Sequence, residues 1–174
     1  MTDMIWNHAT LGMGRWRAWL TDHGSLTQRL RSPFPDFNVL QLCQSVAPPY
    51  FDEAAPVGLS GHQPALIREV LLRSGATPLV FAHTVIPLTG LRGPWRAVAG
   101  LGNRSLGSAL FANPRVKRFP LAYKRLDRRH PLYRAALPYL AAPEAMLWGR
   151  RSQFALAGHV LMVTEVFLPS ILRK

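Results

Sequence analysis

Two pairs of apolar segments, each pair joined by a short turn, constrain the fold of this chain more than any other feature. Residues 146–156 and 160–168 are rich in apolar and β-branched residues and flank the dipeptide Ala157-Gly158. Residues 79–86 form a second β-branched and aromatic run, and a turn-rich stretch precedes them. Such runs separated by turn residues are typical of β-hairpins. We therefore expect hairpins in both regions.

The first strand of the earlier hairpin is ambiguous from the pattern alone. Residues 65–72 lie between Pro64 and Gly75, which also suits a helix. The turn at residues 73–78 and the strand pattern after it favour the hairpin. Residues 37–46 are predicted to form another strand, with Leu40, Leu42 and Val46 on one face, followed by a proline- and glycine-rich loop at 47–64.

Helices are expected outside these strands. Residues 9–30 have a helical pattern, and Gly24 suits the end of its first part. Ser25 and Gln28 form a capping-box pattern, which predicts a second helix that begins at Leu26 and ends before Pro33. Shorter helical turns are expected within 90–102 and 105–111. Hairpin strands with separate helices predict the α+β class, with an antiparallel sheet covered on one side.

Composition indicates a folded chain with one domain over residues 1–174. The 174 residues are 48% hydrophobic and only 17% charged, which excludes an intrinsically disordered chain. The longest uncharged run, residues 74–91, contains prolines and glycines and is too short for a membrane-spanning helix. Nothing near the N-terminus resembles a signal peptide, so we expect a cytoplasmic protein. Cys43 is the single cysteine and is expected in the core.

The net charge of +12 is concentrated in one segment. Residues 115–134 contain one acid, Asp127, and many of the basic residues: Arg115, Lys117, Arg118, Lys124, Arg125, Arg128, Arg129 and Arg134. A solvated loop and helix face is the simplest interpretation of this segment. An RNA or phospholipid surface is the alternative. The aromatic residues that would form a base-stacking platform are few here, which argues against nucleic acid.

Common catalytic motifs are missing from the sequence. No metal-binding spacing of histidines or cysteines occurs, so no metal is expected. Residues 58–62 resemble a nucleophile elbow, but His62 stands where the second glycine is needed. Residues 100–105 lack the last glycine of a dinucleotide-binding loop, because Ser105 occupies that position.

Charged residues inside apolar strand faces are the strongest chemical signal. Glu165 shares a strand face with Leu161, Val163 and Phe167, and Arg68 shares one with Leu66, Val70 and Leu72. A charge on an apolar face is costly unless it is paired or has a task. Either the two residues form a structural pair or solvated positions, or they line a functional site. Arg150 and Arg151 interrupt another strand and must face opposite sides; one is a candidate anion ligand.

Six motifs in register carry a family resemblance: WLTDHGSLTQRL at 19–30, IREVLL at 67–72, AHTVIP at 82–87, SLG at 105–107, WGRRS at 148–152 and TEVFLP at 164–169. Together they resemble bacterial chorismate lyases over nearly the whole chain. The resemblance implies a six-stranded antiparallel sheet with helix-turn-helix flaps over a buried ligand cavity. It also implies that chorismate loses pyruvate to give 4-hydroxybenzoate for ubiquinone, without metal or organic cofactor.

The resemblance assigns roles to individual residues. Arg68 would bind the ring carboxylate together with the backbone amides of Leu26 and Leu106, which lie at predicted helix N-termini where anions are favoured. Glu165 would meet the ring hydroxyl and serve with Arg68 in catalysis. Arg150 or Arg151 is the candidate for the second carboxylate of chorismate. We further expect a monomer without nucleic-acid partners.

Two points are open at this level. The family often has arginine where this chain has His83; a ligand contact there would make affinity pH-dependent, whereas a structural position would not. A further hypothesis is that the segment 115–134 docks on anionic lipid, because the resemblance implies a membrane prenyltransferase as the consumer of the product. A non-catalytic ligand-sensing domain of a transcription regulator, which shares this fold, is the alternative function.

Overall fold

The structure, a computed structural model, describes residues 5–173. Its strands are β1 (Phe37–Ala47), β2 (Ala65–Ser74), β3 (Thr77–Pro87), β4 (Lys117–Arg118), β5 (Ala122–Leu126), β6 (Leu147–Leu156) and β7 (His159–Phe167). Its α-helices are α1 (Arg17–Leu20), α2 (Leu26–Arg31), α3 (Leu88–Leu91), α4 (Leu106–Ala112) and α5 (Pro131–Ala136). Short 3-10 turns are η1 (Gly14–Trp16), η2 (Ala55–Val57), η3 (Arg96–Gly100), η4 (Leu137–Tyr139) and η5 (Pro169–Leu172). The α+β class is confirmed.

All strand pairs are antiparallel, in the order β1-β2-β3-β7-β6-β4, with β5 also paired to β6. The expected count of six strands is thus corrected to seven. The sheet still has six positions, because β5 pairs with one half of β6 and β4 with the other. Pro120 lies between them and cannot donate a backbone hydrogen bond. The outermost position is therefore filled by two strands in succession.

Both predicted hairpins are confirmed. β2 pairs with β3 along its whole length, so residues 65–72 are a strand and not a helix. β6 and β7 are joined by Ala157 and Gly158, whose φ angles of 49° and 79° are both positive. Two consecutive positive φ angles are the signature of a type I′ turn, whose twist matches that of the strands it joins.

Strand β1 departs from the predicted face pattern. A bulge between Gln41 and Cys43 shifts the register against β2 by one residue. Beyond it the faces exchange, so Leu40 and Leu42 pack on one core while Val46 is 58% exposed. The same edge strand leaves Cys43 exposed, which corrects its expected place in the core.

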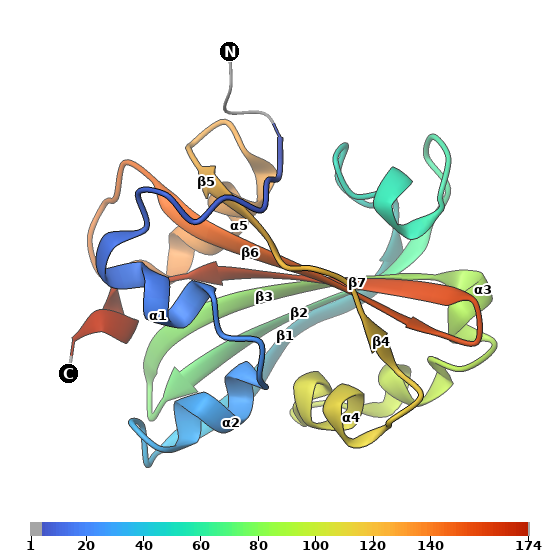
Figure 1. The fold of residues 1–174 in the computed structure, drawn as a ribbon, viewed down its shortest axis with the longest axis horizontal. Helices are drawn as coiled ribbons and strands as arrows, with labels where there is room; N and C mark the ends of the chain where they lie inside the picture. Colours follow the sequence, from blue (N-terminus) through green and yellow to red (C-terminus); the bar gives the residue numbers. More distant parts are fainter. Residues whose placement is uncertain (1–4, 174) are drawn as a thin grey trace.

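Helices and loops cover both faces of the sheet, whereas one covered face was expected. Figure 1 shows α2 and α4 below the sheet and residues 48–64, in cyan, above it. On the lower face, Leu26 and Leu30 of α2 pack in one cluster with Val70 and Phe167. On the upper face, α5 packs against residues of β2, β3 and β7. The sheet is therefore the middle layer of three.

The first N-terminal helix is shorter than predicted at both ends, whereas the second helix has the predicted bounds. Regular structure begins at Gly14, not at residue 9, and α1 ends at Leu20. Helix α2 spans Leu26–Arg31, and the Ser25 side chain accepts a hydrogen bond from the backbone N–H of Gln28, as the capping pattern predicts. Among residues 5–173, no helix is long and apolar enough to cross a bilayer.

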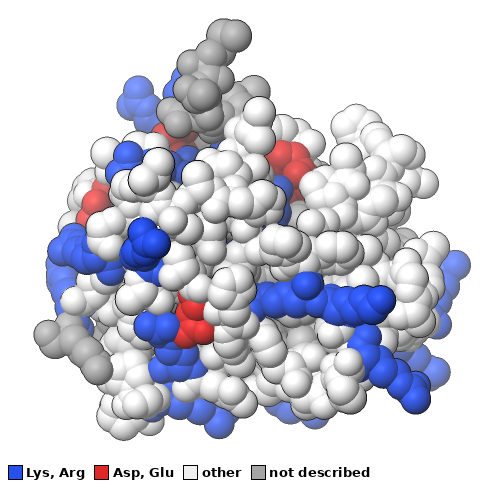
Figure 2. Space-filling view, in the orientation of Figure 1, with Lys and Arg blue, Asp and Glu red and all other residues white. Residues whose placement is uncertain are grey.

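The basic segment 115–134 is not one solvated face. It forms β4, β5 and the start of α5. Lys124 is buried and Arg118 is half-buried, while six basic residues are exposed: Arg115, Lys117, Arg125, Arg128, Arg129 and Arg134. Figure 2 shows that Lys and Arg side chains are spread over much of the face in view, with few Asp or Glu between them.

Candidate active site

A cavity lies on the lower face of the sheet, beneath two flaps. We define the first flap as residues 17–31, with α1 and α2, and the second flap as residues 88–112, with α3 and α4. The cavity has about 580 Å³ of space, part of it open to solvent, and side chains from β2, β3, β6 and β7 form its floor. Its lining includes Leu26, Arg68, Leu106, Arg118, Arg150 and Glu165.

Strand register places the two predicted charged positions on this floor. Arg68 pairs with Thr84 across β2 and β3, and Glu165 pairs with Ala82 across β7 and β3. One strand, β3, separates them, and their partners on β3, Thr84 and Ala82, are two residues apart. Their backbones therefore lie about 12 Å apart, from two strand spacings across the sheet and two residues along it. Both residues line this one cavity, as expected, although the cavity is partly open to solvent and not enclosed. They do not form a pair with each other.

Arg68 is a buried cation without a carboxylate partner in the part of the chain that the structure describes. Its side chain is 1% exposed. Its Nη2 donates to the carbonyl oxygens of Gly102 and Arg104, at 2.9 and 3.0 Å, and its Nε has no partner among residues 5–173. Burial lowers the pKa of Arg68. An uncompensated charge of this kind is costly, so the arrangement is suited to an anionic ligand.

Two helix N-termini meet beside Arg68. Ser25 and Ser105 cap α2 and α4, so Leu26 and Leu106 occupy the first helical positions, where backbone N–H groups have no partner within the helix. The Oγ1 of Thr27 lies 2.7 Å from the Oγ of Ser105 and joins the two termini. Both leucines line the cavity. The two backbone N–H groups and the guanidinium of Arg68 are thus all hydrogen-bond donors, which suits an anionic ligand.

Glu165 is held by Arg150, which faces it across β6 and β7. The Arg150 Nε donates to Glu165 Oε2 at 2.6 Å. Its Nη1 donates to the carbonyl oxygens of Trp19 and Asp22, at 3.2 and 2.9 Å. Arg150 therefore orients Glu165 and ties the first flap to the floor of the cavity at the same time.

Arg118 also lines the cavity, and sequence reasoning missed it because it lies within the basic run. Its Nη2 donates to Ser152 Oγ at 2.8 Å, and its Nη1 donates to the carbonyl oxygen of His23 at 2.6 Å. The guanidinium carbon lies 5.2 and 5.3 Å from the ring centres of Phe111 and Phe154. A two-residue strand at the edge of the sheet gives no readable alternation, so no pattern marks this side chain.

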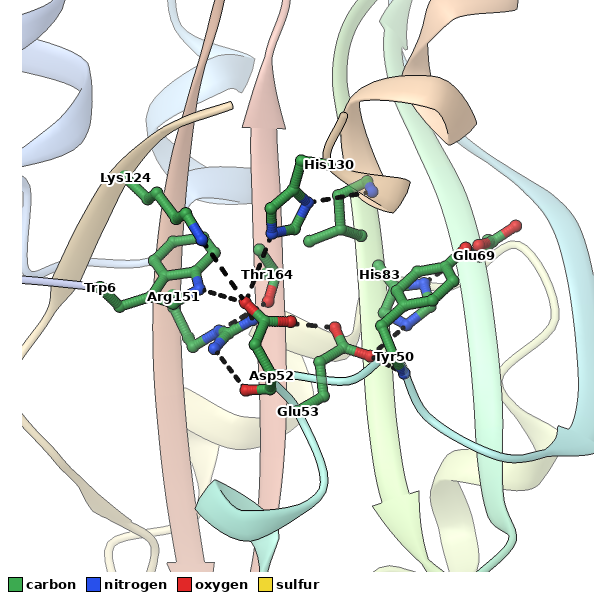
Figure 3. Close-up of polar contacts among 11 residues, drawn as sticks. Trp6, Tyr50, Asp52, Glu53, Glu69, His83, Lys124, His130, Arg151 and Thr164 are labelled. Atoms are coloured by element: carbon green, nitrogen blue, oxygen red, sulfur yellow. Dashed lines mark hydrogen bonds and ion pairs between the residues drawn. The ribbon is translucent and has the colours of Figure 1, made fainter. Parts of the chain in front are cut away.

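Arg151 is on the opposite face of the sheet, which removes it as a candidate for the cavity. It is nevertheless buried. Its Nη2 donates to Asp52 Oδ2 at 3.2 Å, and its Nε donates to Thr164 Oγ1 at 3.3 Å (Figure 3). Consecutive strand residues point to opposite faces, and only Arg150 has the parity of Glu165.

The upper face carries a polar network, formed by Trp6, Tyr50, Asp52, Glu53, Glu69, Lys124, His130 and Arg151 around His83 and Thr164 (Figure 3). Burial opposes the charged form of Asp52, but hydrogen bonds from His130 and Trp6 and the charge of Arg151 outweigh it and lower the Asp52 pKa.

The part of the chain that is described contains no group of three or more His, Cys, Asp or Glu side chains placed to hold a metal ion.

His83 belongs to this network and does not reach the cavity. It is 1% exposed, with Nδ1 3.0 Å from Glu69 Oε1 and Nε2 3.2 Å from Glu53 Oε2. The Tyr50 ring stacks on it. Burial lowers the pKa of His83, but the two carboxylates outweigh burial and raise it to about 9. Of the two possibilities left open by the sequence, the structural position is the one observed.

Comparison with known proteins places this geometry in a family. The sequence profile described as chorismate lyase matches residues 6–174. A protein of Thiobacillus denitrificans named probable chorismate pyruvate-lyase is 51% identical over 156 residues, which cover 90% of this chain and 83% of that protein. A protein of the same name from Nitrosospira multiformis is 50% identical over 159 residues, covering 91% and 88%.

Solved structures share the fold at low sequence identity. A GntR-family transcriptional regulator of Bacillus cereus is 14% identical, with a TM-score of 0.56 over 78% of this chain and 93% of that one. The effector domain of PhnF from Mycobacterium smegmatis is 13% identical, with a TM-score of 0.55 over 84% and 90%. At this identity the likeness shows the fold alone.

Proposed function

The chain belongs to the chorismate lyase family, and from this membership we propose that its lower-face cavity removes pyruvate from chorismate to give 4-hydroxybenzoate. The observation that carries the assignment is Arg68, a buried cation without an acidic partner among residues 5–173, in the same cavity as Glu165. The product would serve ubiquinone biosynthesis, as membership of the family implies.

We assign the ring carboxylate of the substrate to the Arg68 end of the cavity. The guanidinium supplies charge and directed N–H donors, and the amides of Leu26 and Leu106 supply two further donors. When it is bound there, the ring carboxylate supplies the negative charge that the buried Arg68 otherwise lacks as a partner. Both flaps then contact the ligand through their helix N-termini.

The ring hydroxyl is assigned to Glu165. Arg68 and Glu165 are two strands and two residues apart on one face, and this separation, shortened by their side chains, leaves room for one six-membered ring. Arg150 fixes the carboxylate of Glu165, so its remaining lone pairs are positioned to accept a hydrogen bond from the hydroxyl. The substrate is therefore held at both ends of its ring.

The chemistry requires positioning more than added reagents. The C4–H and C3–O bonds of chorismate break, the ring gains its third double bond, and the enolpyruvyl methylene takes up the proton as its oxygen becomes the ketone of pyruvate. Atoms and electrons balance within the substrate, so the step as written consumes no cofactor. Holding the enolpyruvyl arm over C4 supplies much of the rate enhancement by orientation. We propose that Glu165 orients the hydroxyl in this step.

A ligand-sensing domain without catalysis is the second candidate, and the fold shared with regulator domains favours it. Identity of about half the residues to proteins named as lyases favours the enzyme. The test is incubation of the purified protein with chorismate while absorbance of 4-hydroxybenzoate and release of pyruvate are followed. Equal amounts of both products support the proposal. Tight binding of chorismate without turnover would instead support the function of a ligand-sensing domain.

A further inference from the structure

Chorismate has a second carboxylate, on the enolpyruvyl arm, and the residues assigned above leave it without a partner. We propose that Arg118 binds this carboxylate and thereby distinguishes the substrate from the aromatic product. The proposal rests on the proposed function, because the enolpyruvyl carboxylate is a property of that substrate. It replaces the earlier candidate pair, Arg150 and Arg151.

Arg118 lies at the correct end of the cavity. It pairs with Phe154 across β4 and β6, and its side chain reaches Ser152, which shares a face with Arg150. Arg118, Arg150 and Glu165 all line this cavity. Burial, and then the charge of Arg150, lower the pKa of Arg118, while the charges of Glu165 and Asp22 raise it. On the substrate the enolpyruvyl oxygen is on the carbon next to the one that carries the hydroxyl. A group that binds the arm must therefore be near Glu165.

The hydrogen bonds of the two arginines separate their roles. Arg150 is fully buried and engages Glu165 through Nε and the first flap through Nη1. The Arg118 Nε is buried and has no hydrogen-bond partner in the described part of the chain. Its Nη1 and Nη2 bind only one neutral oxygen each. The guanidinium of Arg118 is therefore a cation near Glu165, and it forms no ion pair with an acid among residues 5–173.

Arg118 also touches both flaps. Its bond to the carbonyl of His23 reaches the first flap, and its contact with the Phe111 ring reaches the second. A carboxylate bound here holds both flaps against β4 and β6. When pyruvate leaves, this carboxylate leaves with it, whereas the ring carboxylate remains on the product. Arg118 should consequently stabilise the substrate complex and have little effect on the product complex.

The experiment compares ligands with one and two carboxylates. The variants are Arg118→Gln and Arg118→Lys, with Lys117→Gln as the matched control, since Lys117 is the exposed neighbour on β4. Calorimetry gives Kd for 4-hydroxybenzoate and for an inert analogue that carries a carboxymethoxy group at ring carbon 3. Steady-state kinetics give KM and kcat for chorismate.

For Arg118→Gln we expect KM for chorismate and Kd for the analogue to rise by about 10-fold to 150-fold, the range for one charge-assisted bond. Kd for 4-hydroxybenzoate should change by less than about threefold, which also shows that the cavity is still folded. Arg118→Lys should be intermediate, because it keeps the charge and loses the fork. Lys117→Gln should match the native protein.

Two results overturn the proposal. If Arg118→Gln binds both ligands more weakly by the same factor, Arg118 has a general structural role. If its affinity for neither ligand changes, Arg118 does not bind the second carboxylate, and Arg150 remains the candidate. The proposed function is judged separately, by whether the native protein converts chorismate. If it does not, the two Kd values still decide whether Arg118 recognises a second carboxylate.

Discussion

Arg150 and Arg151 are consecutive residues whose guanidinium groups lie on opposite faces of the sheet, and each meets a carboxylate there. Arg150 binds Glu165 on the cavity face, and Arg151 binds Asp52 on the upper face. Their cross-strand neighbours on β7 are Glu165 and Thr164. The β6–β7 pair is thus held from both sides at the position that presents Glu165 to the substrate.

Replacement of Arg68 by alanine should weaken substrate and product alike, because both carry the ring carboxylate. We expect KM for chorismate and Kd for 4-hydroxybenzoate to rise together, each by a factor that corresponds to a loss of about 1.5 to 3 kcal/mol in binding free energy. Steady-state kinetics and calorimetry measure the two quantities. Arg73→Ala, on the same strand and outside the cavity, is the control. A rise in KM without a change in product affinity would place the ring carboxylate elsewhere.

Glu165→Gln tests whether Glu165 orients the hydroxyl or transfers a proton. The amide keeps an oxygen that can accept from Arg150 and from the ring hydroxyl, so an orienting role predicts a fall in kcat of less than about tenfold. A fall of about a hundredfold or more, with a changed pH–rate profile, would instead show proton transfer. Glu144→Gln, a half-buried position outside the cavity, should leave kcat unchanged.

Asp52→Asn should destabilise the fold without touching the cavity. The change removes the nearer of two carboxylates beside buried Arg151 and leaves only Glu53 Oε1, at 3.9 Å. Breaking a buried pair outright costs about 3 to 5 kcal/mol, which is the upper bound here. Urea unfolding measures the loss. Asp127→Asn, which breaks the exposed contact with Arg129, should have little effect on the same measurement. Native stability of Asp52→Asn would contradict this account of the upper-face network.

His83 should make stability fall as pH rises. Its folded pKa of about 9 lies above the model-peptide value of 6.5, so its contribution is fully present below pH 6.5 and is lost as pH rises through 9. The contribution is up to about 3 kcal/mol, at 1.36 kcal/mol per pKa unit. The free energy of unfolding of the native protein should exceed that of His83→Gln most at low pH. A constant difference between pH 6 and pH 10 would show that folding does not raise the pKa of His83.

The exposed basic residues of segment 115–134 predict weak attraction to anionic membranes. Each well-placed Lys or Arg contributes about 1 kcal/mol near such a surface, and salt screens the effect. Sedimentation at low salt should recover more protein with anionic vesicles than with neutral vesicles. Equal recovery with both would end this proposal.

Strand periodicity located the cavity residues where the backbone is regular. Arg68 and Glu165 are each flanked at i ± 2 by apolar residues in unbroken strands, so their faces could be read from the sequence. Ser25 likewise fixes the start of α2 through a local hydrogen bond. Val46 was misplaced because a bulge four residues earlier exchanges the faces of β1, and nothing in the local pattern marks that insertion.

Residues whose role depends on distant segments could not be predicted. Arg118 reaches the cavity only because β4 packs beside β6 and the loop of His23 comes over it. Arg151 is buried because Asp52, from a proline-rich loop, folds against the upper face. In both cases the partner is far away in the sequence, and charge alone suggested a solvated position.

The outer edge divided between β4 and β5 and the bulge in β1 both hinder the pairing of this sheet with a sheet of another molecule. Unpaired edge strands are templates for aggregation. At one edge, Pro120 breaks the line between β4 and β5, and Asn7 hydrogen-bonds to both backbone groups of Tyr123 on β5. At the other, the bulge bends β1 and the Asn103 side chain accepts from the backbone N–H of Gln41. Neither edge offers a long, flat strand to a second molecule, so the sheet is protected from growth into fibrils.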